Sequence, residues 1–336
     1  MKAVIFAGAL AASAFSVNSA LAEEPQRPAP PKIEALPPAP DPSDPQVLAR
    51  RAAYAEAMQK ADALQLAVFG GAAKDVTLKG ALTQGGLVFG ETIPGSKVTL
   101  DGEDVMIGDD GRFVIGFGRD AAPSSLLAVT LPSGEVERVA LKIADRDFPV
   151  QRIDGLDESK VSKFTKEDLA KIAEDKKLKD AARAATEKAE DWAHGFAMPI
   201  AGTVTGVFGS QRILNGTPKT PHSGVDVAAP KGTPVRAPAD GVVTLAEPNM
   251  YFEGGLVLID HGFWVESALM HMSKVEVKAG DHVKKGEEIG LVGATGRATG
   301  PHMHWGVKWM ETPVDPQLLL ADGPAPAPIA AKGGAQ

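Results

Sequence analysis

The segment Pro221-His222-Ser223-Gly224-Val225-Asp226 holds two metal-ligand side chains four residues apart, and Pro301-His302-Met303-His304-Trp305-Gly306 holds two more at a spacing of two. In an extended strand successive side chains alternate between faces, so residues two or four positions apart point the same way. We therefore expect each pair to share one face of its strand. If the two strands lie close together, imidazole and carboxylate groups converge on one cation. The spacing leaves open whether His302 or His304 binds it.

Length and composition limit what the protein can be. With 336 residues the chain has room for two domains with their own cores. The net charge of −8 argues against nucleic-acid binding and against a polybasic membrane contact. There is no cysteine, which excludes disulfides, a thiolate zinc site, a cysteine nucleophile and a lipidated cysteine. Any metal must therefore be held by His, Asp or Glu.

The N-terminus predicts export. Residues 1–22 combine a basic start, an uncharged apolar stretch and the small-residue sequence Ala20-Leu21-Ala22, which is typical of a cleaved signal peptide. A membrane-spanning helix is the alternative, but Ser and Asn interrupt the stretch and Glu23-Glu24 follows it directly. No second stretch is long and apolar enough to span a membrane. We expect an exported protein without a membrane span after cleavage, located in the periplasm.

The next part of the chain predicts a linker, a helix and a small β domain. Proline recurs through residues 23–45, which favours an extended linker. Residues 46–69 contain no Gly or Pro and favour a helix. Between residues 76 and 150, short alternating runs are separated by turn sequences such as Asp101-Gly102 and Asp110-Gly111, which predicts an immunoglobulin-like β-sandwich. This region contains no histidine, so we expect it to serve as a spacer, with ligand binding as the alternative.

A polar connector helix is predicted over residues 165–193. Thr165 and Asp168 form a capping-box pattern, and the apolar stripe of the charged run that follows is narrow, as is typical of a solvated connector. The alternatives are a cover over the active site and a surface for a partner. Beyond it, short strands and glycine turns predict an antiparallel all-β domain over residues 198–316. The Ala, Pro and Gly-rich tail at residues 321–336 predicts disorder.

Six of the seven histidines lie between positions 222 and 304. A catalytic Zn²⁺ ion takes three protein ligands and keeps one position open for water. His222, Asp226 and one of the two paired histidines would supply that set. The bound water then becomes a nucleophile near neutral pH, and the ion polarises the carbonyl under attack. We therefore predict that the active site lies in the second domain.

The region from Met198 to Pro316 resembles the lysostaphin-like, LytM-type zinc peptidases, which cleave peptide bonds in peptidoglycan. The matching residues include Phe208-Gly209, His222 to Pro230, Gly232 to Val235, Asp240 to Val243, Ile259 to Gly262, Met270 to Ser273, Gly293 to Gly296 and Gly300 to Trp305. The resemblance implies zinc bound by His222, Asp226 and His304. It also implies that His271 and His302 transfer protons and steady the attacking water and the oxyanion.

The expected fold class is thus mainly β, with an N-terminal immunoglobulin-like β-sandwich, a polar connector helix and a C-terminal antiparallel all-β metallopeptidase domain. The chain departs from the family pattern at Leu269, where Tyr is frequent two residues before His271, so we expect a hydrogen bond near the site to be missing. The positions that carry the chemistry are all retained, whereas relatives that have lost them activate other cell-wall hydrolases.

The resemblance favours a zinc endopeptidase acting on peptidoglycan stem peptides or cross-links. A non-catalytic activator of a separate cell-wall amidase is the alternative, and a peptidase acting on another secreted protein is a third. The partner class that we expect is a cell-wall hydrolase or a division protein.

The other three histidines are not assigned to the chemistry, and the nearby basic residues have two interpretations. His261 lies in a turn and is expected to be structural, His282 is expected to be exposed, and His194 is assigned no role. Three basic residues flank the motifs and either meet acidic groups of the wall peptide or belong to the ordinary surface. They are Lys231, Arg236 and Arg297.

Overall fold

The computed structural model describes residues 75–154, 158 and 161–320. Strands dominate these residues, which confirms the mainly β fold class. No helix within these ranges has the length and apolar character that a membrane span requires. Four predictions lie outside the described residues. They are the signal peptide at 1–22, the linker at 23–45, the helix at 46–69 and the tail at 321–336.

Seven short strands between residues 76 and 142 form two antiparallel sheets, ordered β1-β2-β5 and β4-β3-β6-β7. Their bounds are β1 Val76–Gly80, β2 Leu87–Thr92, β3 Lys97–Leu100, β4 Glu103–Val105, β5 Arg112–Gly116, β6 Ser124–Thr130 and β7 Val136–Lys142. The predicted Asp101-Gly102 turn joins β3 to β4, with Gly102 in the left-handed region at φ 91°. Buried residues of both sheets, such as Phe113 and Leu127, belong to one hydrophobic core. The immunoglobulin-like topology itself stays a prediction.

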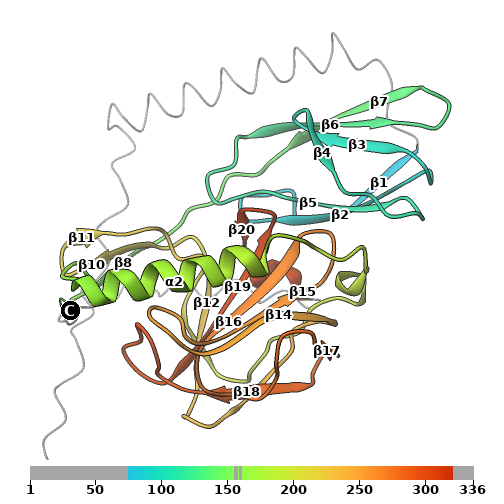
Figure 1. Ribbon diagram of the computed structural model, residues 1–336. Helices are drawn as coiled ribbons and strands as arrows, with labels where there is room; N and C mark the ends of the chain where they lie inside the picture. The colour runs from blue at the N-terminus through green and yellow to red at the C-terminus, as the bar shows by residue number, and fades with distance from the viewer. Residues whose placement is uncertain (1–74, 155–157, 159–160, 321–336) are drawn as a thin grey trace, which may run out of the picture. The chain divides into compact units, whose positions relative to one another are not determined.

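The predicted antiparallel β domain contains a ten-stranded sheet. Its main path is β17-β14-β15-β16-β19-β12-β9, while β13 pairs with β18, β18 with β16, and β20 with β19. The bounds are β9 Thr203–Gly206, β12 Gly224–Ala228, β13 Pro234–Arg236, β14 Gly241–Met250, β15 Gly254–Asp260, β16 Val265–Val275, β17 His282–Val283, β18 Glu288–Val292, β19 His302–Trp309 and β20 Thr312–Val314. A short helix, η3 (Pro316–Leu319), follows. Figure 1 shows these strands in yellow to red.

A small separate sheet joins segments that are far apart in the sequence. β8 (Val150–Ile153) pairs in parallel with β10 (Gln211–Leu214), and β10 pairs with β11 (Thr217–Pro218). The first residue of β8 is the last residue of the predicted β-sandwich. This sheet matters for function because β10 carries a side chain that reaches the candidate site.

The connector helix is shorter than predicted. α2 spans Lys166–Ala182, and the predicted capping box is present, since Thr165 Oγ1 accepts from Asp168 N at 3.1 Å and Asp168 Oδ2 accepts from Thr165 N at 2.9 Å. The predicted end at residue 193 is wrong. Arg183, the C-cap residue, forms a bidentate ion pair with Glu266 on β16, with N–O distances from 2.7 to 3.1 Å. Residues Asp191–His194 form a separate 3-10 helix, η2.

The apolar stripe expected for this helix does not hold it in place. Leu169 and Leu178 are exposed, whereas the polar residue Asp175 is buried. Asp175 accepts a hydrogen bond from Tyr251 N at 2.6 Å, and Lys179 pairs with Glu253 in the turn between β14 and β15. α2 therefore lies against the sheet through polar contacts and is not a freely solvated connector (Figure 1).

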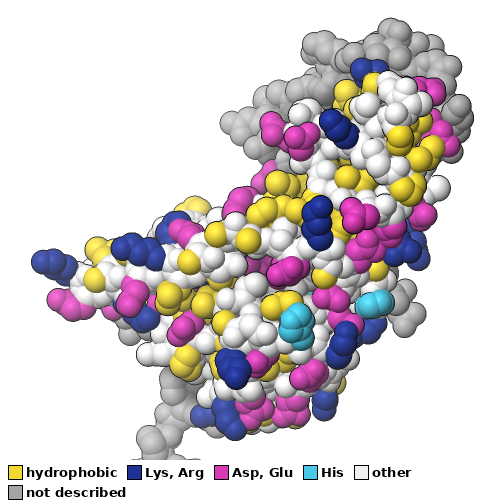
Figure 2. All heavy atoms as spheres, turned by 45° about the vertical axis from the view of Figure 1, so that its right-hand side comes forward, with side chains coloured by type: hydrophobic (Ala, Val, Ile, Leu, Met, Phe, Trp, Pro, Cys, Tyr) yellow, Lys and Arg dark blue, Asp and Glu magenta, His cyan; other side chains and the backbone are white. Residues whose placement is uncertain are grey.

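The surface of the described residues carries mixed charge. On the face drawn in Figure 2, Lys and Arg side chains are interspersed with Asp and Glu side chains. Positive and negative charges are thus balanced locally on that face.

Candidate active site

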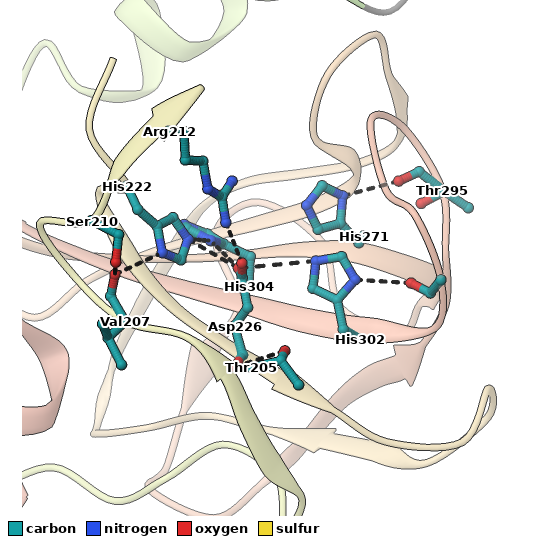
Figure 3. Close-up of polar contacts among 11 residues, drawn as sticks. Thr205, Val207, Ser210, Arg212, His222, Asp226, His271, Thr295, His302 and His304 are labelled. Atoms are coloured by element: carbon teal, nitrogen blue, oxygen red, sulfur yellow. Dashed lines mark hydrogen bonds and ion pairs between the residues drawn. The ribbon is translucent and has the colours of Figure 1, made fainter. Parts of the chain in front are cut away.

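Three metal-ligand side chains converge in the C-terminal sheet. Asp226 on β12 and His304 on β19 are direct partners in the antiparallel register. His222 Nε2 lies 3.0 Å from Asp226 Oδ1 and 2.9 Å from His304 Nδ1, and His304 Nδ1 lies 2.8 Å from the same carboxylate oxygen. All three residues are buried (Figure 3). We call His222, Asp226 and His304 the His–Asp cluster.

The Phe208-Gly209 motif positions His222, which precedes β12. His222 N donates to the carbonyl of Ser210 at 2.9 Å, and the carbonyl of His222 accepts from Gly209 N at 2.8 Å. Gly209 has a φ of 79°, and a Cβ there would lie 2.0 Å from the Phe148 ring. Only glycine fits this turn without strain. The Phe208-Gly209 turn is therefore hydrogen-bonded to the backbone of His222, a member of the cluster.

Each member of the cluster is oriented by a second contact. His222 Nδ1 donates to the carbonyl of Val207 at 3.1 Å, which leaves its Nε2 lone pair facing the cluster. The two carboxylate oxygens of Asp226 have different partners. Oδ1 faces the two imidazoles, and Oδ2 accepts a hydrogen bond from the guanidinium of Arg212 on β10. Sequence reasoning missed Arg212. The only signal was its place shortly after the Phe208-Gly209 motif.

The protonation states of the cluster suit a cation. Burial lowers the pKa of His222, although its hydrogen bond with Asp226 works in the opposite direction. Burial alone would raise the pKa of Asp226, but hydrogen bonds with His222 and His304 bring that pKa well below its usual range. A neutral imidazole beside an ionised carboxylate is the form that binds a divalent metal.

The donor set fits zinc. The three ligand atoms, two imidazole nitrogens and one carboxylate oxygen, lie within 4.8 Å of one another. Three protein ligands of this kind leave a coordination position open, as catalytic zinc sites do. Two ring nitrogens that face each other at 2.9 Å need a proton or a cation between them.

His271 and His302 lie beside the cluster. Their ring centroids are 4.7 Å apart, and the centroid of His271 is 6.3 Å from that of His304. His271 Nδ1 donates to the carbonyl of Thr295 at 2.9 Å, and His302 Nδ1 donates to the carbonyl of Gly300 at 2.9 Å. Each ring therefore keeps its Nε2 available for proton transfer. His302 Nε2 lies 3.9 Å from Asp226 Oδ1, so His304 is the nearer of the two paired histidines to the carboxylate.

The backbone around His271 is irregular. His271 has a φ of 67°, in the left-handed region that non-glycine residues rarely adopt. The register of β16 with β18 shifts just beyond it, between Met272 and Lys274. Burial lowers the pKa of His271 to about 3, and the neighbouring histidines add to this effect. A strained, buried and neutral imidazole beside the His–Asp cluster is a feature typical of functional sites.

One expectation about the site is wrong. Leu269 does not face the cluster, because it is fully buried in the hydrophobic core and pairs with Trp305, whereas the next residue, Met270, pairs with His304. Successive residues of a strand face opposite sides of the sheet. The replacement of Tyr by Leu269 therefore does not remove a hydrogen bond from the metal-binding face.

The remaining histidines lie away from the cluster. His261 is fully buried, with Nδ1 2.6 Å from the carbonyl of Asp240 and Nε2 2.8 Å from Ser267 Oγ, as a structural histidine would be. His282 is exposed, as predicted. His194 lies on η2, not at the end of an α-helix, with Nδ1 3.2 Å from Asp240 Oδ2. Lys284 and Lys285 also donate to the Asp240 carboxylate, which leaves it little capacity for a metal.

Comparison with known proteins agrees with this geometry. Residues 220–316 match the model of peptidase family M23. Peptidoglycan DD-endopeptidase ShyA of Vibrio cholerae is 47% identical over 85 residues, which cover 25% of this chain and 20% of ShyA. DD-carboxypeptidase/endopeptidase Mpg of Neisseria meningitidis is 46% identical over 103 residues, which cover 31% of this chain and 24% of Mpg. The matched region thus spans only a minor part of both relatives.

A solved structure extends the match beyond the catalytic region. The crystal structure of a putative peptidase M23 from Pseudomonas aeruginosa is 31% identical, with a TM-score of 0.54. The likeness covers 71% of this chain and 94% of the Pseudomonas chain. Because nearly the whole of that protein is matched in both sequence and fold, this chain belongs to peptidase family M23, and the resemblance to LytM-type peptidases is confirmed.

Proposed function

We propose that this protein is a zinc-dependent endopeptidase that hydrolyses peptide bonds in the stem peptides or cross-links of peptidoglycan. The observation that carries the proposal is the convergence of three ligand atoms in the His–Asp cluster. Membership of a peptidase family supports it, and so do the names of the two curated relatives. Substrate and metal are proposals for this chain.

In this proposal the His–Asp cluster holds the metal, and His271 and His302 transfer protons. Zinc bound at the cluster would acidify a water molecule and polarise the scissile carbonyl. The Nε2 atoms of His271 and His302 are free to exchange protons, since both Nδ1 atoms donate to backbone carbonyls. One imidazole takes the proton as the water oxygen bonds to the carbonyl carbon, and that proton passes to the amine as the C–N bond breaks. While it holds that proton, the same imidazole donates its Nε2–H to the oxyanion. The other imidazole, whose Nδ1–H is bound to a backbone carbonyl, accepts a hydrogen bond from the attacking water at Nε2.

The test is digestion of purified peptidoglycan sacculi followed by mass analysis of the released muropeptides. The wild-type protein should release cross-linked peptides, and a chelator or His222→Ala should stop release. His282→Ala is the matched control, because His282 is exposed and distant in sequence from the cluster. Full activity of the His222→Ala protein would overturn the proposal.

Metal content separates the enzyme from the alternative, a non-catalytic activator of a cell-wall amidase. The retained cluster favours the enzyme. We expect about one zinc ion per chain, whereas a zinc-free protein that stimulates an amidase would support the activator. Export to the periplasm, with a cell-wall hydrolase or a division protein as partner, is part of the same proposal and is tested by fractionation of cells and by affinity capture.

A further inference from the structure

Two arginines flank the His–Asp cluster and have no part in the hydrolysis described above. Arg212 on β10 contacts Asp226, and Arg297 lies in the loop between β18 and β19. The same loop supplies the Thr295 carbonyl that accepts from His271. In Figure 3, Arg212 lies beside His222 and His304, while Thr295 lies at the other end of the row of histidines. We call Arg212 and Arg297 the arginine pair.

The Arg297 side chain is held in place by an aromatic ring. Its guanidinium carbon lies 4.6 Å from the centroid of the Phe252 ring, and Arg297 N donates to the carbonyl of Phe252 at 2.8 Å. Phe252 is fixed in turn by edge contacts with Phe164 and Tyr251. A guanidinium stacked on an aromatic ring keeps the N–H groups along its edge available for an anion.

Arg297 has no acidic partner among the residues that the structure describes. Its residue is exposed, and no carboxylate within these ranges lies at ion-pair distance from it. Glu253 is the nearby acidic residue, but its Oε1 is taken by Lys179 on α2. A fixed and unpaired guanidinium at the edge of a candidate active site is suited to binding an anionic group of a substrate.

The two arginines share one electrostatic environment. Partial burial lowers the pKa of Arg297, and the positive charge of Arg212 lowers it further. On Arg212, Nε is buried and has no hydrogen-bond partner among the described residues. Like charges held near each other repel unless an anion compensates them. Asp226 already compensates the charge of Arg212, so Arg297 is the member of the pair whose guanidinium has no ion-pair partner among the described residues and can take up an anion from a ligand.

We propose that the arginine pair binds a free carboxylate of the substrate peptide next to the scissile bond. Arginine is the side chain best matched to carboxylates, because its planar fork donates two parallel hydrogen bonds. The site would select cross-linked peptides that carry a free carboxylate over glycine bridges, which carry none beside the scissile bond. This inference rests on the proposed endopeptidase function and specifies its substrate class.

The test compares two substrates with the metal-loaded protein. One is a purified cross-linked muropeptide dimer with free carboxylates, and the other is the same dimer with its carboxylates converted to carboxamides. The wild-type protein should prefer the carboxylate form. Arg297→Ala should lower kcat/KM for that form by about 10- to 100-fold, the range expected for a charge-assisted contact, and leave the amidated dimer unaffected. Arg297→Lys should recover part of the loss.

Arg236→Ala is the matched control, since Arg236 is exposed and donates to the carbonyl of Gly286 on another loop. Zinc content should be equal in all variants, because none of them changes a member of the His–Asp cluster, and thermal unfolding should show that each variant is folded. If neither dimer is cleaved while sacculi stay intact, the proposed function fails. If both dimers are cleaved equally well by wild-type and Arg297→Ala proteins, the function stands and the carboxylate site is refuted.

Discussion

The C-terminal β domain contains two buried histidine sites, His261 and the His–Asp cluster. They differ in the groups that their ring nitrogens face. At His261, Nδ1 donates to the carbonyl of Asp240, and Nε2 accepts from Ser267, whose hydroxyl also accepts from Trp305. Every nitrogen there has a complementary partner. In the His–Asp cluster, by contrast, two imidazole nitrogens and one carboxylate oxygen lie 2.8 to 3.0 Å from one another and have to share the proton or cation between them.

The comparison shows that burial alone does not identify a metal site. His261 is completely buried, and the cluster residues retain slight exposure. Burial lowers the pKa in both environments, to about 4 for His261 and also below its usual range for His222. They differ in hydrogen bonding. In the His261 network, which we call the closed network, each ring nitrogen has a complementary donor or acceptor, whereas the ligand atoms of the His–Asp cluster need a proton or a cation between them.

The largest expected effect comes from removing a cluster residue. Asp226→Ala should abolish zinc binding and lower the rate of muropeptide release by at least about 1,000-fold, because both the nucleophile and the polarised carbonyl depend on the metal. Metal analysis and digestion of sacculi measure the two effects. His261→Asn, in the closed network, should retain zinc and activity. Zinc retained in the Asp226→Ala protein would remove the distinction between the two environments.

A smaller loss is expected at His271, which lies beside the cluster but is not one of its members. His271→Ala should keep about one zinc per chain and lower kcat by roughly 100- to 1,000-fold, as removal of a proton-transfer group does. Metal content and kcat measured on the same sample separate this role from metal binding. Loss of zinc from His271→Ala would instead place His271 among the ligands.

Part of this site could be predicted from the sequence. His302 and His304 both lie on β19, and Asp226 lies on β12, as the even spacing indicated. His222 lies before the first residue of its strand, so the turn after Phe208-Gly209 positions it and alternation along a strand does not. Alternation along a strand therefore explains the position of Asp226, His302 and His304 but not that of His222. The choice between His302 and His304 came from the family resemblance alone.

The features that could not be predicted all depend on contacts between distant segments. Arg212 reaches Asp226 because β10 joins β8 in a separate small sheet, a pairing that no local pattern encodes. α2 ends at Ala182, and its C-cap residue Arg183 pairs with Glu266 on the sheet. Leu269 was expected near the site because the family pattern often has Tyr at this position, although its side chain belongs to the core. The alternating runs of the N-terminal sheets, in contrast, were visible locally.

Arg212 provides a test of how the cluster is oriented. Arg212→Ala should weaken zinc binding by about 10- to 100-fold, because outer contacts of metal ligands have effects of this size. Competition with a chromophoric chelator in the absence of substrate measures the affinity. Lys231→Ala, at an exposed residue near the motifs, serves as the control. Unchanged zinc affinity would show that Asp226 keeps its orientation without the guanidinium.

The smallest effect is expected at His261, in the closed network. It concerns the free energy of unfolding and not activity. The pKa of His261 lies at about 4 in the fold, below its ordinary value of 6.5, because burial disfavours the charged ring. Between these values the unfolded chain binds more protons than the folded one, so the free energy of unfolding falls as pH drops from 6.5 to 4. The contribution of His261 to this fall is on the order of 3 kcal/mol.

His261→Asn should remove that contribution, because Asn does not titrate in this range, while its amide can still donate to the carbonyl of Asp240. At pH 7 the variant should be less stable than the wild type, since it loses the contact with Ser267. The difference should shrink as the pH falls through 6.5 to 4. Denaturant unfolding of chelated protein at a series of pH values measures both curves, with His282→Asn as the control. Parallel curves for wild type and His261→Asn would mean that the closed network does not exclude a proton, and the contrast with the His–Asp cluster would then rest on metal binding alone.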